Sequence, residues 1–207
     1  YEVVEDSVGR QGKGERMSGA TWFIGDLHFG HEKVAGLRGF ADTITHDKSI
    51  IHQWRKQVQA GDLVHILGDL SSGSRTGESH ALNILMDLPG RKRLIAGNHD
   101  SVSGIHRTVS PHLVKFNAAF ERVTDFARIR VNAENVLLSH YPYTADHMDD
   151  ARYMQYRLPD LGLPLIHAHT HSAERTAAGP HQLCVSWEAW GRMVNMGDVA
   201  AWLADTP

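Results

Sequence analysis

Five short apolar segments each end in polar side chains that can bind a metal ion, and this recurrence is what most constrains the fold. In the clearest case, residues 94–96 are apolar and are followed directly by Gly97, Asn98, His99 and Asp100. Such a run indicates a buried strand, and a glycine can take the positive φ that a sharp turn at its end needs. Taken alone, Asn-His-Asp after a glycine is equally compatible with ordinary turn chemistry.

The same arrangement recurs after four other strand-like runs. Residues 21–24 lead to Asp26 and His28, 63–67 to Asp69, 136–138 to His140, and 163–166 to His169 and His171. In open α/β sheets, ligands bind beyond the carboxyl ends of the strands. The Asp-x-His and His-x-His spacings would place both side chains on one face of an extended segment. We therefore expect these side chains to converge on one side of a sheet.

Helical periodicity between these runs predicts an α/β fold. Apolar residues at helical spacing indicate a helix over residues 47–59 and another over 78–88, and a short helix is expected from Asp198. Residues 123–131 resemble a strand with one wet face, and 182–187 resemble another strand. Residues 1–18 are polar and predict a loose N-terminal extension, which leaves 19–207 as one domain.

The chemistry of the donors predicts a pair of divalent ions. Carboxylate, amide and imidazole ligands without thiolate suit manganese, iron, nickel or zinc better than calcium or magnesium alone. About eight donors are too many for one such ion. They fit two ions roughly 3.5–4 Å apart with one carboxylate between them, the arrangement used for displacement at phosphorus. Manganese is the favoured metal.

The ordered set of motifs resembles that of the calcineurin-like metallophosphoesterases. The match runs from about residue 21 to 171, and residues 26–31 and 88–92 are most similar to small bacterial and phage members. The resemblance implies a four-layer α-β-β-α sandwich with a dinuclear centre at its strand ends. It also implies that Asp26, His28 and His171 hold one metal, that Asn98, His140 and His169 hold the other, and that Asp69 bridges them.

The resemblance also implies roles for residues that do not bind metal. His99 would face the scissile phosphate as an acid, with Asp100 behind it, and His31 follows the first motif closely enough to touch substrate. Ala168 departs from the usual glycine before the His-x-His pair, at a slight expected cost. His167 raises a question of register, because residues 167, 169 and 171 would point the same way in a straight strand.

The expected reaction is phosphodiester hydrolysis by in-line attack of a hydroxide that bridges the two metals. Residues 70–73 lack the Asp-Arg-Gly continuation of the Ser/Thr protein phosphatases, and so the arginine that grips a phosphomonoester there. We therefore favour small phosphodiesters of nucleotide or cyclic-nucleotide type. A phosphomonoesterase, a nuclease with the same centre and a non-catalytic scaffold of the same fold are the alternatives.

Composition bears on partners and location. The net charge of −3 provides no global basic field for nucleic acid, and no apolar run is long enough to span a membrane. One cysteine, Cys184, fits a reducing compartment, and the N-terminus lacks an apolar signal segment. We therefore expect a cytoplasmic protein that binds a small phosphoester, whereas the oligomeric state is left open.

Overall fold

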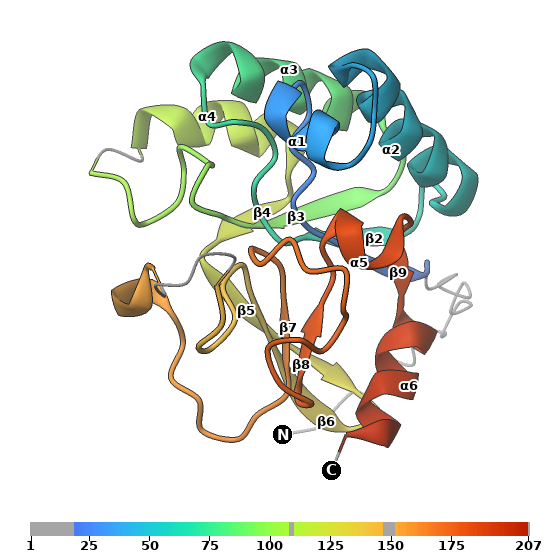
Figure 1. The fold of residues 1–207 in the computed structure, drawn as a ribbon, viewed down its shortest axis with the longest axis vertical. Helices are drawn as coiled ribbons and strands as arrows, with labels where there is room; N and C mark the ends of the chain where they lie inside the picture. Colours follow the sequence, from blue (N-terminus) through green and yellow to red (C-terminus); the bar gives the residue numbers. More distant parts are fainter. Residues whose placement is uncertain (1–18, 108–109, 147–151, 207) are drawn as a thin grey trace, which may run out of the picture.

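The computed structural model describes residues 19–107, 110–146 and 152–206. Two β-sheets and six α-helices form within these ranges, which confirms the predicted mixed α/β class (Figure 1). The predicted N-terminal extension, residues 1–18, lies outside the described residues. No helix in the described part of the chain is both long and apolar enough to cross a membrane.

The first sheet brings three of the predicted strand ends to one edge. Its strand order is β4-β3-β2-β1-β9. These strands are β4 (Arg122–Thr124), β3 (Arg91–Ile95), β2 (Leu63–Ile66), β1 (Thr21–Ile24) and β9 (Val194–Asn195). The first four run parallel and in register, whereas β9 is antiparallel to β1. The carboxyl ends of β1, β2 and β3 therefore open on the same side.

The second sheet contributes the other two strand ends. Its order is β5-β6-β7-β8, with β5 (Phe126–Val131), β6 (Glu134–Ser139), β7 (Leu165–His167) and β8 (Gln182–Cys184). A two-residue turn with positive φ at Asn132 and Ala133 joins β5 to β6, as expected for a tight hairpin. Strands β6, β7 and β8 are parallel. A bridge between Gly25 and Ser186 joins the ends of β1 and β8 across the two sheets.

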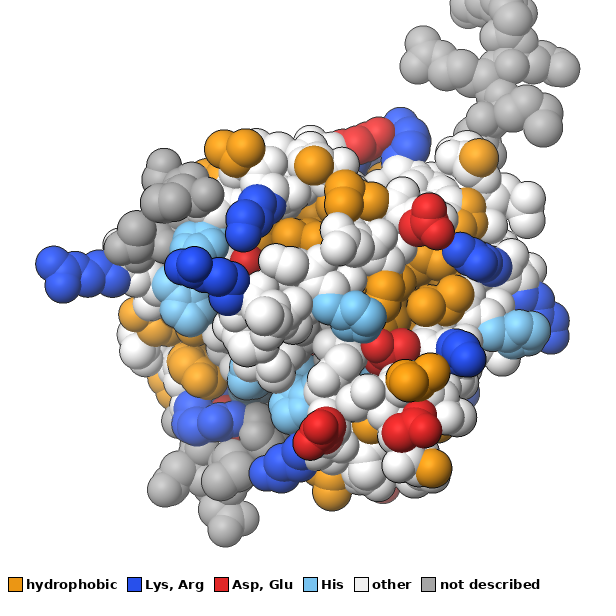
Figure 2. All heavy atoms as spheres, turned by 90° about the horizontal axis from the view of Figure 1, so that it is seen from above, with side chains coloured by type: hydrophobic (Ala, Val, Ile, Leu, Met, Phe, Trp, Pro, Cys, Tyr) orange, Lys and Arg blue, Asp and Glu red, His pale blue; other side chains and the backbone are white. Residues whose placement is uncertain are grey.

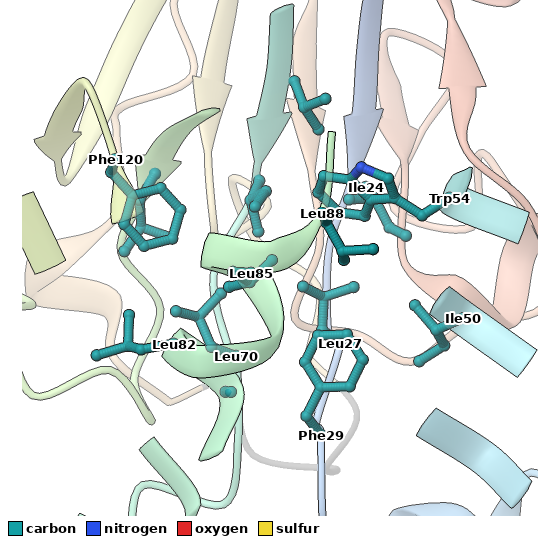
Figure 3. Close-up of a cluster of buried hydrophobic side chains, with 14 of the residues drawn as sticks. Ile24, Leu27, Phe29, Ile50, Trp54, Leu70, Leu82, Leu85, Leu88 and Phe120 are labelled. Carbon is teal, nitrogen blue, oxygen red and sulfur yellow. The ribbon is translucent and has the colours of Figure 1, made fainter. Parts of the chain in front are cut away.

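Four helices cover the outer face of the first sheet: α1 (Glu32–Leu37), α2 (Thr43–Gln57), α3 (Arg75–Asp87) and α4 (Ser110–Ala119) (Figure 1). Their apolar sides pack on that sheet in a helix-side core, which contains Ile24, Leu27, Phe29, Trp54 and Leu85 (Figure 3). A second, inter-sheet core contains Phe23, Leu67, Ile95, Leu138, Ile166 and Val199. Both faces of the first sheet are thus covered, which explains why its central strands β1 and β2 are largely apolar.

The chain ends in two further helices. Helix α5 (Trp187–Trp190) follows β8, and α6 (Met196–Asp205) packs Val199 and Leu203 against the inter-sheet core. Asn195 and Asp198 cap α6 reciprocally, so the helix begins two residues before the predicted start at Asp198.

Three local features differ from the sequence-based prediction. Residues 122–131 form two strands in different sheets, because the chain crosses from one sheet to the other at Asp125. The predicted strand over 182–187 ends at Cys184, and its last residue begins α5. Helix α1 and strand β9 were not predicted, since six and two residues are too short to show periodicity.

Candidate metal centre

The polar side chains after β1, β2, β6 and β7 form two adjacent groups. An outer group consists of Asp26, His28 and His171, and an inner group consists of Asp69, His140 and His169. Within each group, one ligand-type atom from each residue lies within 4.8 Å of the others, so each group could hold a metal ion. Asn98 joins the inner group through its Oδ1, which is 3.2 Å from Nε2 of His140.

Asp69 lies between the two groups. Its Oδ2 is 3.5 Å from Nε2 of His140 and 3.8 Å from Nε2 of His28 in the outer group. Its Oδ1 accepts the backbone N–H of His99 at 2.9 Å. One buried carboxylate therefore faces both groups, as a bridging ligand must.

The turns that carry these side chains are left-handed, not extended. The φ angles are 52° at Asp26, 47° at His28, 55° at Asp69, 69° at His169 and 51° at His171. Non-glycine residues rarely take such values, which cost of order 1–3 kcal/mol each and cluster at functional sites. The predicted extended geometry is therefore wrong, and His169 and His171 lie in different groups.

Apolar anchors hold the strained turns in place. Leu27 and Phe29 alternate with the outer-group residues Asp26 and His28, and both are fully buried in the helix-side core (Figure 3). Leu70, which directly follows Asp69, is likewise buried in the helix-side core. The sequence thus uses adjacent residues for opposite purposes, one side chain for the core and the next for the site.

Backbone carbonyls orient two of the histidine rings. His28 donates from Nδ1 to Ser71 O at 3.1 Å, and His140 donates from Nδ1 to Leu67 O at 2.7 Å. Each ring is then left with Nε2 facing the centre, which is the usual way in which proteins fix a metal-binding imidazole. His169 is turned the other way, with Nδ1 3.3 Å from Nε2 of His140 and Nε2 3.3 Å from Asp146.

The His171 ring is oriented by a carboxylate. Its Nδ1 is 2.6 Å from Oε1 of Glu188, and its Nε2 is 3.3 Å from Nε2 of His28. Glu188 is itself paired with Arg38 at 2.8 Å, and Arg38 also donates to the carbonyl of Asp26 at 2.6 Å. Neither Glu188 nor Arg38 was predicted. Arg38 follows a short helix and not a strand, and Glu188, which comes directly after the strand predicted over 182–187, lies on helix α5.

A buried oxygen of Asp26 indicates that the outer group fits a cation. Oδ2 accepts the N–H of His169 at 2.9 Å and the hydroxyl of Ser186 at 2.5 Å. Oδ1 is buried without a hydrogen-bond partner. Leaving a carboxylate oxygen unsatisfied in the interior is costly, and a bound divalent ion would remove that cost.

The pKa values of the outer-group residues also indicate a site for positive charge. Burial raises the pKa of Asp26 and lowers that of His28 well below its usual value, so His28 is held in the neutral form that binds metals. Burial alone would lower the pKa of His171, but the carboxylates of Asp26 and Glu188 outweigh it and raise that pKa to about 9. The outer group therefore attracts positive charge, either a proton or a metal ion.

His99 belongs to neither group. Its side chain is 40% exposed, and its Nε2 is 4.0 Å from Oδ2 of Asp69. Its Nδ1 contacts the carbonyl of Ser72 at 3.2 Å. The ring can therefore reach a substrate placed beside Asp69 without being a ligand itself.

Asp100 does not support the His99 ring as predicted. Its two oxygens accept the backbone N–H groups of Asp69, Leu70 and Gly97 at 2.8–3.0 Å. Burial, followed by the charge of Asp69, raises the pKa of Asp100 to about 7. Asp100 thus holds the turn that carries Asp69. The group beside the His99 ring, where Asp100 was expected, is the backbone carbonyl of Ser72.

Close packing, not positive φ, explains Gly97. Its φ is not positive, contrary to expectation, but an added Cβ would lie 2.3 Å from Oδ1 of Asp69. Ala168 likewise has a reason, since its Cβ fills the space where a side chain at Gly25 would lie, at 2.4 Å. Ala168 is fully buried there, so the alanine is accommodated by the glycine opposite.

His167 and His31 lie outside both groups, in different environments. His167 is buried in β7, outside both groups, with its Nδ1 2.8 Å from the carbonyl of Ala168. His31 precedes α1, and its ring centroid is 5.3 Å from that of His28. His31 also lines the pocket of about 1020 Å³ that opens from the two groups, so a small molecule bound in that pocket would lie beside it.

Comparison with known proteins gives relatives whose names state no activity. No model of a known protein family matches the chain. It is 42% identical to the gene 66 protein of Mycobacterium phage L5 over 189 residues, which cover 86% of this chain and 91% of that protein. The gene 66 protein of Mycobacterium phage D29 is also 42% identical, over 193 residues that cover 89% and 96%.

More distant matches extend to archaea and bacteria. An uncharacterized protein of Methanocaldococcus jannaschii, MJ1445, is 27% identical over 131 residues, which cover 62% of this chain and 72% of that protein. The crystal structure of AQ665 from Aquifex aeolicus, a protein of unknown function, superimposes with a TM-score of 0.67 at 23% identity, covering 88% of this chain and 98% of that one. This likeness concerns the fold alone. On the identity and coverage of its phage relatives, the chain belongs to the family of mycobacteriophage gene 66 proteins.

Proposed function

We propose that the protein is a dinuclear metal-dependent phosphodiesterase of the calcineurin-like metallophosphoesterase type. The observation that carries the proposal is the position of Asp69, whose Oδ2 lies within 4 Å of a histidine nitrogen in each group. Two sheets stacked on a common core, with helices outside the first sheet and α6 packed on that core, are compatible with the four-layer sandwich of that family.

In this proposal each group holds one divalent ion, manganese being favoured. The outer ion would be held by Asp26, His28 and His171, the inner ion by Asn98, His140 and His169, and Asp69 would bind both. Bound ions of this kind supply a nucleophile from water at neutral pH and offset charge on the phosphoryl oxygens.

The remaining chemistry falls to His99. Its exposed ring stands beside Asp69 on the open side of the centre, where the ester oxygen of a substrate would depart. Protonation of that oxygen by His99 would make a poor leaving group acceptable. The hydrogen bond from the His99 N–H to Asp69 fixes the distance between this acid and the bridging carboxylate.

The charges at the pocket favour a diester over a monoester. Of the described residues that line it, Lys33 and Arg38 carry a fixed positive charge. Arg38 is buried and committed to Glu188 and to the carbonyls of Asp26 and Leu27, so its donors are not offered to a substrate. A phosphomonoester dianion would therefore lack an arginine clamp, whereas a diester carries one charge fewer.

The face formed by the outer helices gives no specific support to a nuclease. On the face formed by the outer helices, acidic, basic and histidine side chains are interspersed, with no continuous basic track (Figure 2). A track of that kind is how proteins follow a long nucleic acid backbone. A small phosphodiester is the better match.

The test is reconstitution of metal-depleted protein with manganese, nickel, iron(II) or zinc. We expect two ions per chain by elemental analysis, and hydrolysis of bis(p-nitrophenyl) phosphate that depends on them. p-Nitrophenyl phosphate, 2′,3′- and 3′,5′-cyclic nucleotides, dinucleoside phosphates and oligonucleotides complete the panel. Two bound ions without turnover of any phosphoester would point to a scaffold, and failure to bind any metal would remove the proposal altogether.

A further inference from the structure

Two hollows meet at the candidate centre. The larger, of about 1020 Å³, opens over both metal-ligand groups, and the smaller has about 440 Å³. Asn98 and His99 line both of them, so the two hollows share a wall at the residues closest to the proposed chemistry. Binding pockets for small molecules typically have roughly 300–1,000 Å³, and each hollow is large enough for one part of a substrate.

The larger hollow, here called the α1 hollow, has apolar side chains in its lining as well as the metal-ligand residues. It is lined by Val34 and Leu37 of α1, Phe40 after that helix, and Trp187 of α5. Leu37 is 78% exposed, although it lies on the pocket wall. An exposed leucine beside aromatic residues suits a flat, apolar group such as a nucleobase, and Lys33 at the same wall adds one positive charge.

The smaller hollow, here called the Ser/His hollow, is lined by polar residues and one glycine. Its lining comprises Ser72, Gly73, Asn98, His99, Ser101, His106 and His112. The hydroxyl of Ser101 is buried and has no hydrogen-bond partner. Glu78 beneath it accepts the Ser101 N–H at 3.1 Å and lies 3.8 Å from His112. Donors and acceptors of this kind suit an alcohol rich in hydroxyl groups, such as a sugar.

We propose that the substrate is an acyclic nucleoside phosphodiester with one ester group in each hollow, an inference that rests on the proposed function. The phosphorus would lie at the shared wall, the nucleoside in the α1 hollow and the second, polar alcohol in the Ser/His hollow. A monoester would fill one hollow at most. A cyclic nucleotide would do the same, because both of its ester oxygens belong to one ribose.

The test compares substrates on the metal-reconstituted protein. We expect kcat/KM to be higher for a dinucleoside monophosphate than for 3′,5′-cyclic AMP or for AMP. Leu37→Ser and His106→Ala, both at exposed positions, should each lower kcat/KM on the dinucleoside monophosphate about 10-fold more than on ethyl p-nitrophenyl phosphate. In that smaller diester both groups are attached directly to the phosphate, with no ribose to carry them along either hollow. Leu161→Ser and His52→Ala, exposed and outside both linings, are the matched controls and should change neither substrate.

Binding supplies a readout that does not need turnover. Calorimetry on the metal-depleted protein should show the dinucleoside monophosphate bound more tightly than AMP, and each hollow variant should weaken it. Equal losses on both kinetic substrates, or a preference for the cyclic nucleotide, would overturn the two-hollow assignment while leaving the phosphodiesterase proposal intact. If no phosphoester is hydrolysed, the proposed function fails, and the binding comparison alone then decides whether the hollows take the two halves of a diester.

Discussion

The inner and outer groups of the centre are held by different parts of the fold. The inner-group residues Asp69, His140 and His169 are all buried, and the His140 ring is fixed by a main-chain carbonyl within the same pair of sheets. In the outer group, the His171 side chain is 26% exposed and depends on Glu188, which in turn depends on Arg38. The inner group is thus a product of sheet geometry, whereas the outer group is completed by side chains of α5 and of the residue that follows α1. We expect the outer group to be the more easily emptied.

Asp69→Asn should weaken metal binding in both groups and so remove the difference between them. The amide keeps the shape of the carboxylate but loses its charge and its second anionic oxygen, and the Asp69 carboxylate faces a histidine of each group. We expect no measurable turnover and reduced occupancy of both metals by elemental analysis. Two fully bound metals in this variant would show that Asp69 is not the bridge.

Substitution of the paired histidines should separate the groups. His171→Ala should release only the outer ion and His169→Ala only the inner one, each with severe loss of activity, because the two residues lie in different groups. His167→Ala should keep both ions and instead lower the free energy of unfolding by about 2 kcal/mol or more, since it leaves a void in β7. A metal-free but stable His167→Ala protein would mean that the ligand pair is shifted by two residues.

His99→Ala should leave both metals bound and lower only the rate of the chemical step. A proton delivered in the transition state contributes about 10²–10⁴-fold, and more when the departing oxygen is basic. The loss should therefore be much greater on a dinucleoside phosphate than on bis(p-nitrophenyl) phosphate. The same factor on both substrates would assign His99 to phosphate binding in place of proton transfer.

Glu188→Gln should weaken the outer group without touching the inner one. Glutamine can still accept a hydrogen bond from His171 but supplies no charge, and the loss of such an outer contact typically costs about 10–100-fold in metal affinity. Metal titration should show this decrease for one of two ions. Glu174→Gln, at an exposed position nearby in the chain, removes the same charge and should change neither ion.

The difference between the inner and outer groups also explains which parts of the site could be predicted from the sequence. The strand ends were identifiable because a buried strand is apolar and each site residue interrupts that pattern, as at Asp69 after residues 63–67. The α/β class followed from the same segments, and the parallel order of the strands brings their ends together.

The outer support could not be predicted in this way. Glu188 lies in a four-residue helix and Arg38 directly after a six-residue one, and only the tertiary fold brings them together across 150 positions of sequence. The left-handed turns were also missed, because nothing in Asp-x-His or His-x-His distinguishes a strained turn from an extended segment. The role of Asp100 was misjudged for a related reason, since a neighbour in sequence need not be a neighbour of the ring.

The smallest expected effect comes from a histidine that lies away from both groups. His65 of β2 is buried and stacks on Phe23 with ring centroids 5.4 Å apart, and burial, helped by Arg93, lowers its pKa to about 4. The unfolded chain would protonate this histidine near its usual pKa of about 6.5, so between pH 6.5 and 4 the unfolded state binds more protons than the folded state. His65 therefore favours folding less and less as the pH falls through that window. The expected decrease in the free energy of unfolding is about 1–3 kcal/mol, since one pH unit of pKa difference corresponds to about 1.4 kcal/mol. His65→Phe keeps an aromatic ring against Phe23 but cannot take a proton. This variant should therefore reduce the pH dependence of the free energy of unfolding by that amount. Urea unfolding of the metal-depleted proteins at pH 7.5 and 4.5 measures the difference without a contribution from metal loss. Parallel pH profiles for the two proteins would show that His65 is protonated as readily in the folded state as in the unfolded one.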